Sequence, residues 1–133
     1  METRKVALII FYDNKKRILL QDRKGISKIG EEWGFFGGGI EEGESPEETI
    51  IREVKEELDF DLKNPKFIGV DKNQVNEEKI VERHTFIFPL EENLSKFKQI
   101  EGDNMQLFTL EDAKKLKMVP GDELVIQRLE RVL

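Results

Sequence analysis

Apolar and polar positions follow one another in short blocks along the chain, a pattern that predicts strands separated by turns and loops. Residues 5–12 are rich in apolar side chains, the polar turn 13–16 follows, and 17–21 are mainly apolar again, which predicts a β-hairpin. Residues 22–32 are polar and predict a surface loop. The three glycines at 37–39 are expected to break any regular element. Further strands are predicted at residues 33–36, 67–70, 80–90 and 106–109.

The clearest helix signal begins at Ser45. Ser45 is a typical N-cap residue, Pro46 suits the first helical position, and Glu48 completes a capping box. Apolar residues then recur at helical spacing as far as Leu58. Two more helices are predicted, one starting at Thr109 and one over residues 121–132. Strands that alternate with helices indicate an α+β fold in which a mixed sheet packs against helices.

The composition narrows the classes of function. The 133 residues include 22 Lys and Arg against 28 Asp and Glu, a net charge of −6, which argues against a protein that binds nucleic acid duplexes. With no cysteine and a single histidine, His84, disulfides, thiolate zinc sites and two-histidine metal sites are excluded within the chain. Enzymatic chemistry would therefore have to depend on carboxylates, hydroxyls, Lys, Arg or backbone groups.

The organisation of the chain predicts one domain over residues 1–133. Hydrophobic residues make up 38% of the sequence, and we find no repeat, low-complexity tract or linker. The first five residues lead into a run of only about six apolar residues, too short for a signal peptide or a membrane span. We therefore expect a cytoplasmic protein that does not bind membranes and is a monomer or a homodimer.

Three carboxylates in the first predicted helix form the main candidate for chemistry. Glu53, Glu56 and Glu57 stand at positions i, i+3 and i+4, so they share one helix face at a cost of roughly 0.2–0.5 kcal/mol per like-charged pair. A hard divalent cation such as Mg²⁺ would remove that cost and would activate a water for attack on phosphorus. An isolated acidic cluster is more often a solvated face, but the preceding glycines and the adjacent Arg52 favour a metal site.

A phosphate-binding P-loop is the alternative suggested by the glycines. Gly38 and Gly43 have the G-x-x-x-x-G spacing, but Glu44 occupies the position at which a P-loop has lysine. A carboxylate there would repel nucleotide phosphates. The sequence therefore excludes the P-loop.

Residues 38–60 resemble the Nudix box, G-x5-E-x7-R-E-U-x-E-E-x-G-U, in which U is a bulky apolar residue. The match covers eight of the nine defined positions, namely Gly38, Glu44, Arg52, Glu53, Val54, Glu56, Glu57 and Phe60. Asp59 replaces the usual Gly; it follows the helix, where we expect a left-handed conformation at a modest cost in stability and with no loss of chemistry. The approach from Trp33 also resembles the family, although Phe36 stands where Pro is frequent.

The resemblance implies a Nudix-type α/β/α sandwich around a mixed β-sheet, and hydrolysis of a nucleoside diphosphate linked to another group, with Mg²⁺ or Mn²⁺. It implies that Arg52 orients Glu53, that Glu53 or a neighbouring glutamate is the general base, and that Glu44 supports the site. Many relatives supply a further acidic ligand from a loop after the long strand. The metal ligands implied in this way are Gly37 through its carbonyl, Glu53, Glu56, Glu57 and Glu101, with Asp103 as the alternative to Glu101.

Four other residues admit both a structural and a functional interpretation. Arg23 either contacts substrate phosphate, as in similar proteins, or is a solvated surface residue. Phe35 either stacks on a base or belongs to the core. His84 is more readily a structural residue than a substrate contact. Asp122 either binds a base edge or caps the last helix, and we favour the cap.

The substrate is the least determined feature. Related subfamilies carry Pro or Tyr at marker positions beyond the box, where this chain has residues 75–78, Val-Asn-Glu-Glu. Neither the marker for ADP-ribose nor that for dinucleoside polyphosphates is present. We therefore predict a nucleoside triphosphate pyrophosphohydrolase, with oxidised purine nucleotides among the candidate substrates. The alternatives are a nucleotide-sugar hydrolase and a catalytically idle domain that binds a nucleotide or a protein.

Overall fold

A computed structural model of the chain describes residues 1–91, 93–97 and 104–133. Each predicted strand and helix has a counterpart, although β5 is longer than expected and the strand predicted at 33–36 is divided between β3 and β4. The elements are β1 (Glu2–Tyr12), β2 (Ile18–Asp22), β3 (Trp33–Gly34), β4 (Phe36–Gly39), α1 (Pro46–Leu58), β5 (Lys66–Gln74), β6 (Lys79–Pro89), the 3₁₀ helix η1 (Asn93–Lys96), β7 (Met105–Phe108), α2 (Leu110–Ala113) and α3 (Asp122–Val132).

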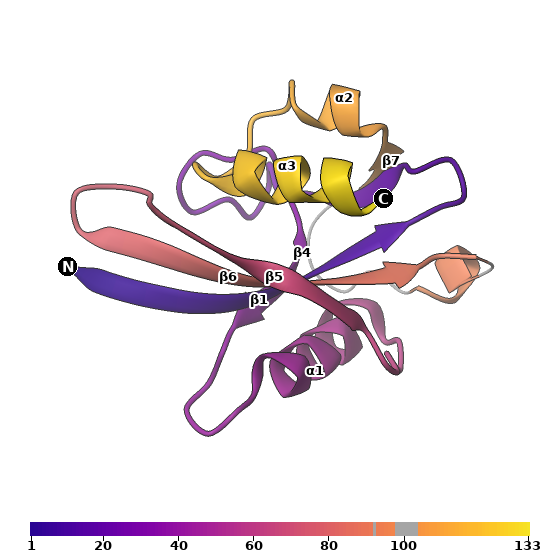
Figure 1. Ribbon diagram of the computed structural model, residues 1–133, viewed down its shortest axis with the longest axis horizontal. Coiled ribbons are helices and arrows are strands. Elements are labelled where there is room, and N and C mark those ends of the chain that lie inside the picture. Colours follow the sequence, from indigo (N-terminus) through magenta and orange to yellow (C-terminus); the bar gives the residue numbers. More distant parts are fainter. Residues whose placement is uncertain (92, 98–103) are drawn as a thin grey trace.

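The strands form one mixed sheet between two layers of helix. The central order is β3-β2-β1-β6-β5, with β4 paired to β1 and β7 paired to β2. β1 and β6 run parallel along their whole length, whereas the other strand pairs of the described residues are antiparallel. Helix α1 covers one face of the sheet, and α2 and α3 cover the other (Figure 1). The predicted α/β/α sandwich around a mixed sheet is therefore present.

The predicted hairpin between the first two strands is short. β1 and β2 pair at Tyr12 and Ile18. Before this point β1 pairs with β4 instead, from Val6 to Ile9, and β2 pairs with β7. The two strands therefore diverge, which leaves room for β4 beside β1.

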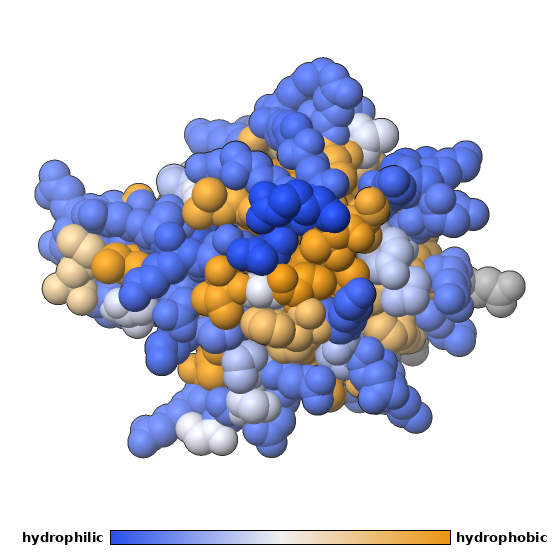
Figure 2. All heavy atoms as spheres, viewed as in Figure 1, coloured by the Kyte–Doolittle hydropathy of each residue, from blue (hydrophilic) through white to orange (hydrophobic). Residues whose placement is uncertain are grey.

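Alternation along β1 divides the core into two layers. Ile9 and Phe11 pack with the apolar face of α1, whereas Ile10 packs with Val125 and Ile126 of α3, because successive side chains of a strand point to opposite faces. Polar side chains cover most of the surface around a central apolar area in the view of Figure 2. Among the residues that the structure describes, no helix is long and apolar enough to span a membrane.

Helix α1 begins and ends as its local sequence predicts. The Ser45 hydroxyl accepts a hydrogen bond from the Glu48 backbone N–H at 3.1 Å, and the Glu48 carboxylate accepts one from the Ser45 N–H at 2.9 Å. At the other end Asp59 adopts the left-handed conformation, with φ 51° and ψ 42°, and donates its N–H to the Lys55 carbonyl. The expected conformation of Asp59 is confirmed.

The prediction for the three glycines is wrong. Gly37, Gly38 and Gly39 do not break the chain but lie in β4, opposite Leu8, Ala7 and Val6 of β1. Gly37 has φ +147°, and a Cβ atom added there would lie 2.1 Å from the Ala7 carbonyl oxygen. Gly37 therefore serves the close approach of β4 to β1, which only a residue without a side chain permits.

Candidate active site

The acidic face of α1 has an inner and an outer part. Glu57 is buried, the Glu53 side chain is 16% exposed and the Glu56 side chain is 57% exposed. The carboxyl groups of Glu53 and Glu57 contact each other, and burial raises the pKa of Glu53 although hydrogen bonds from Glu57 and Arg52 oppose that shift. Two carboxyl groups in contact require a shared proton or a cation, so this part of the face favours a cationic ligand.

Arg52 connects this face to the loop that precedes the helix. Its guanidinium donates two hydrogen bonds to the Glu44 carboxylate, at 2.8 and 2.9 Å, one to Glu53 at 3.0 Å and a longer one to Glu56 at 3.3 Å. Glu44 also accepts from the Thr49 hydroxyl. The hydrogen bonds from Arg52 in particular lower the pKa of Glu44 to about 2. Arg52 is thus fixed by an ionised carboxylate, and it fixes one oxygen of Glu53 in turn.

Gly38 of β4 sets how closely Glu53 approaches the sheet. A Cβ atom added at Gly38 would lie 2.4 Å from the Glu53 carboxylate, so the side chain of Glu53 occupies the space that another residue would fill. Arg52 also donates to the Gly39 carbonyl at 3.3 Å. The acidic face and β4 therefore form one unit, in which the backbone of the strand borders the carboxylates.

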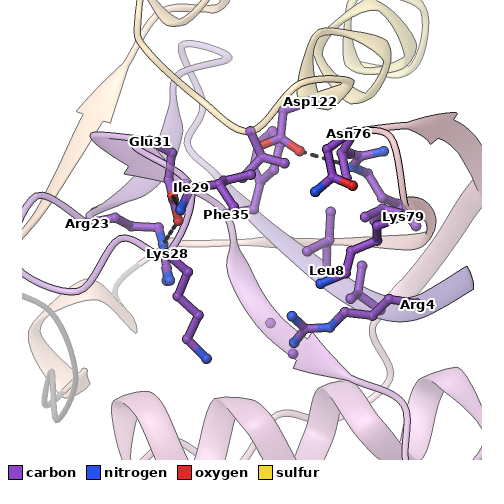
Figure 3. Close-up of a pocket in the computed structure, with 18 residues that line it drawn as sticks. Arg4, Leu8, Arg23, Lys28, Ile29, Glu31, Phe35, Asn76, Lys79 and Asp122 are labelled. Atoms are coloured by element: carbon purple, nitrogen blue, oxygen red, sulfur yellow. Dashed lines mark hydrogen bonds and ion pairs between the residues drawn. The ribbon is translucent and has the colours of Figure 1, made fainter. Parts of the chain in front are cut away.

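A cavity of about 200 Å³ lies between β4, the start of α3 and the connection from β5 to β6. Its wall includes Arg23 from the loop that follows β2, and Phe35, which is 7% exposed (Figure 3). Arg23 donates hydrogen bonds to Glu31 at 2.8 Å and to Gln21 at 3.0 Å. Although the chain has a net charge of −6, the charged side chains of this wall are mostly cationic: Arg4, Arg23, Lys28, Lys79 and Arg83, against Glu31 and Asp122.

A family model described as NUDIX domain matches residues 2–129. The chain belongs to the NUDIX domain family. The resemblance that was seen in the sequence is thereby confirmed, and it extends well beyond the box.

Two known proteins illustrate the relationship in sequence. The chain is 32% identical over 84 residues to the CTP pyrophosphohydrolase of Escherichia coli (strain K12), and this matched segment covers 63% of this chain and 60% of that protein. It is 32% identical over 57 residues to the 8-oxo-dGTP diphosphatase of Proteus vulgaris, and this matched segment covers 43% of this chain and 51% of that protein. In each of these relatives the match spans 60% or less of the relative's length.

The structural likeness is more extensive than the sequence likeness. The MutT protein from Methanosarcina mazei Go1 superposes with a TM-score of 0.79 at 21% identity, over 97% of this chain and 94% of that one. This similarity confirms the predicted fold. The names of the two sequence relatives agree with the predicted class of enzyme, a hydrolase that acts on acid anhydrides.

The structure of this NUDIX domain brings several predicted site residues together. Glu44, Arg52, Glu53, Glu56 and Glu57 form one connected group on α1 and the loop before it. Arg23 and Phe35 line the neighbouring cavity, while Phe35 also belongs to the core cluster under α3. Phe35 is thus a core residue that also borders the cavity, and its stacking on a nucleobase stays a prediction. The predicted ligand Glu101 and its alternative Asp103 lie outside the described residues.

The metal site remains a prediction. In the ranges 1–91, 93–97 and 104–133, no three acidic or histidine side chains converge closely enough to hold one ion between them. Glu56 is instead turned toward Arg52. The donors that the α1 face offers are all oxygen atoms, which suit a hard cation, and the contact between Glu53 and Glu57 favours one. The chemistry of these donors therefore suits a divalent ion, and the gathering of Glu53, Glu56 and Glu57 around one stays a prediction.

Asp122 differs from its expected role. The N-cap of α3 is Gly121, with no side-chain hydrogen bond, and Asp122 is buried and accepts a hydrogen bond from Arg83 at 3.0 Å. Burial raises the pKa of Asp122 to about 6, an effect that outweighs the opposing influence of Arg83. Because Gly121 is the N-cap, the prediction that Asp122 caps the helix is wrong. Asp122 lies in the cavity wall instead.

His84 and Trp33 have structural positions. His84 lies 2.8 Å from the Glu82 carboxylate, and it is not among the residues that line the cavity. The Trp33 ring packs edge-on against Phe108.

The cavity wall includes cations that were not predicted from the sequence, among them Arg83, Arg4 and Lys79. Arg83 is 1% exposed and also donates to the Pro120 carbonyl at 2.9 Å. A signal for it was available, because Arg83 stands between Val81 and Thr85 on the inward side of the alternating strand β6, where a charge needs a partner. Arg4 and Lys79 carry no such signal, since many exposed strand ends have cations.

Proposed function

We propose that this NUDIX domain is a Mg²⁺- or Mn²⁺-dependent pyrophosphohydrolase of nucleoside triphosphates, with oxidised purine nucleotides among the candidate substrates. The observation that carries the proposal is the position of the Glu44–Arg52–Glu53 group, which borders β4 beside a cavity lined with cations. The acidic group suits a divalent ion, and the cationic wall suits a phosphate chain. The names of the sequence relatives support the same class of reaction.

Glu53, Glu56 and Glu57, with the Gly37 carbonyl and Glu101, would hold the metal. The ion would supply a Lewis acid that lowers the pKa of a water and neutralises charge on the phosphates. The oxygen-only donor set fits Mg²⁺ or Mn²⁺ rather than a metal that prefers sulfur or nitrogen.

The residues of the chain position the reactants and move the proton. Glu53 is the group that we assign as base, because burial raises its pKa toward the range in which a carboxylate accepts a proton from water. Arg52 holds the Glu53 carboxylate in one orientation, and Glu44 holds Arg52. Arg23 lines the cavity beside its partners Glu31 and Gln21, and Phe35 provides an apolar wall for the nucleobase. Attack of the water on the α-phosphorus expels pyrophosphate, and attack on the β-phosphorus expels the nucleoside monophosphate; both give the same two products.

The test combines a substrate panel with one pair of variants. The protein is incubated with Mg²⁺ and nucleoside triphosphates, oxidised nucleotides, nucleotide sugars, ADP-ribose and dinucleoside polyphosphates, and the products are identified. Glu53→Gln should lose at least about 10²-fold in turnover, the lower end of what acid–base catalysis contributes. The matched control is Glu47→Gln, which removes an exposed carboxylate from the first turn of the same helix and should leave turnover unchanged.

Each outcome has a distinct meaning. Hydrolysis of nucleotide sugars alone would replace the substrate assignment with the alternative class. Tight nucleotide binding without cleavage of any compound would identify an idle binding domain. A Glu53→Gln variant as active as the parent would overturn the assignment of the base.

A further inference from the structure

Two of the five cationic side chains in the cavity wall already pair with other residues of the protein. Arg23 is bound to Glu31 and Gln21, and Arg83 is bound to Asp122 and to the Pro120 carbonyl. Their charges are balanced within the protein, so they shape the wall. In the part of the chain that the structure describes, the other three cations have neither a hydrogen bond nor an ion pair: Arg4, Lys28 and Lys79. These three are available to a ligand.

Arg4 is the free cation that lies against β4. Adding a Cβ atom at Gly39 would place it 3.6 Å from the Arg4 Nη2 atom and 3.8 Å from its Nε atom, which is ordinary van der Waals contact. The guanidinium therefore rests beside the bare backbone of the strand without strain. Arg4 and Lys28 extend into the cavity from different walls, and Arg4 reaches across toward β4 (Figure 3).

The position of Arg4 relates directly to the acidic group. Gly38 and Gly39 are adjacent in β4, so their missing side chains would point to opposite faces of the strand. Glu53 fills the space at Gly38 and Arg4 borders the space at Gly39. Among the described residues β4 pairs only with β1, which leaves its second edge unpaired. A chain of phosphates that passes this edge meets the guanidinium on one side and the carboxylates on the other.

We propose that Arg4 is a polyphosphate-binding residue, which holds the phosphate chain of the nucleotide on the cavity side of β4 while the bond is cleaved on the side of Glu53. The inference rests on the proposed function. A guanidinium offers five N–H donors in a planar fork that matches two phosphate oxygens, and an unpartnered one loses no internal bond when it binds them. Arg4 thereby raises affinity for the polyphosphate part of the ligand and leaves recognition of the nucleoside to other residues.

The experiment compares three variants of the full chain. Arg4→Gln removes the charge, Arg4→Lys keeps the charge without the fork, and Lys5→Gln is the matched control, because the adjacent Lys5 points to the opposite face of β1. Calorimetry in Mg²⁺ measures binding of a nucleoside triphosphate whose α,β-bridging oxygen is replaced by methylene, and of inorganic tripolyphosphate. NMR titration measures binding of the unphosphorylated nucleoside.

Arg4→Gln should weaken binding of both phosphate ligands roughly 10-fold to 100-fold, the range for hydrogen bonds to a charged group. Binding of the nucleoside and the melting temperature should stay unchanged, and steady-state kinetics should show a higher KM with kcat retained. Arg4→Lys should recover part of the loss, and Lys5→Gln should behave as the parent does.

Two results would overturn the assignment of Arg4. One is unchanged affinity of Arg4→Gln for tripolyphosphate and the triphosphate analogue. The other is an equal loss for nucleoside and phosphate ligands together with a lower melting temperature, which would indicate a structural role. Failure of the proposed function is a separate result: the parent would then cleave no compound of the panel, whatever Arg4→Gln does to tripolyphosphate binding.

Discussion

Two adjacent glycines of β4 should respond in opposite ways to replacement by alanine. At Gly37 the added Cβ atom would lie 2.1 Å from the carbonyl oxygen of Ala7, and the backbone has φ +147°. At Gly38 it would lie 2.4 Å from the carboxylate of Glu53. A backbone carbonyl within a strand pair cannot move without opening the pairing, whereas the end of a side chain can rotate away. Gly37→Ala should therefore damage the fold, and Gly38→Ala should damage the site.

The magnitudes follow from these contacts. An unfavourable backbone conformation alone costs about 1–3 kcal/mol, and loss of the β1–β4 pairing adds to it, so Gly37→Ala should lower the free energy of unfolding by at least about 3 kcal/mol. At about 3–5 °C per kcal/mol this corresponds to a fall in melting temperature of roughly 10 °C or more. Gly38→Ala should change stability by less than about 1 kcal/mol, because reduced freedom of the unfolded chain offsets the local adjustment. Displacement of Glu53 by about 1 Å should reduce turnover about 10²-fold.

The assay pairs urea denaturation with Mg²⁺-dependent hydrolysis of the substrate identified by the panel. Gly43→Ala is the control, since Gly43 has φ +86° but an added Cβ atom would meet no heavy atom within 4 Å. That variant should show the conformational cost, about 1 kcal/mol, without a change in turnover. The reasoning is refuted if Gly38→Ala retains full activity, or if it is destabilised as strongly as Gly37→Ala.

Two further predictions concern stability. The Thr85 hydroxyl is fully buried and finds no hydrogen-bond partner within the described residues. Thr85→Val should therefore raise the free energy of unfolding, measured by urea denaturation, by about 1 kcal/mol. A loss of stability would show that the hydroxyl does have a hydrogen-bond partner. The pKa of Glu44 falls from 4.5 to about 2 on folding, chiefly through hydrogen bonds from Arg52, so its stabilising effect is present above about pH 4.5 and is lost as the pH falls toward 2. Glu44→Gln should therefore show a smaller fall in melting temperature between pH 5 and pH 2 than the parent, and equal falls would contradict this.

Local signals account for what the sequence predicts well. The start of α1 depends on Ser45 and Glu48, which are three residues apart, and its buried face depends on the helical spacing of Ile50, Val54 and Leu58. The conformation of Asp59 follows from its place directly after the helix. Because each of these features depends on residues within one or two helical turns of one another, all the interacting residues lie in one short segment of the sequence. The grouping of three glutamates on one face is predictable for the same reason.

The errors concern contacts between distant parts of the chain. A glycine run is equally consistent with a break and with close approach of two strands, and only the pairing of β4 with β1 decides between them. Asp122 has the position of a helix cap in the sequence, but the fold brings it against Arg83, 39 residues away. Arg4, Lys28 and Lys79 come from separate elements and meet only in the folded cavity. No local pattern could predict which of these cations would remain without a carboxylate partner.

The two sides of β4 carry charges of opposite sign that the protein does not balance alone. On the α1 side, Glu44, Glu53 and Glu56 all pair with the guanidinium of Arg52, and Glu57 contacts Glu53, which leaves an excess of negative charge. On the cavity side the free cations leave an excess of positive charge. A metal complex of a polyphosphate has a cationic and an anionic part, and in the proposed function it neutralises both sides at once. Neither the metal nor the polyphosphate alone neutralises both sides, so we expect the two to bind cooperatively. Without the metal, the net negative charge of the protein would repel nucleotides.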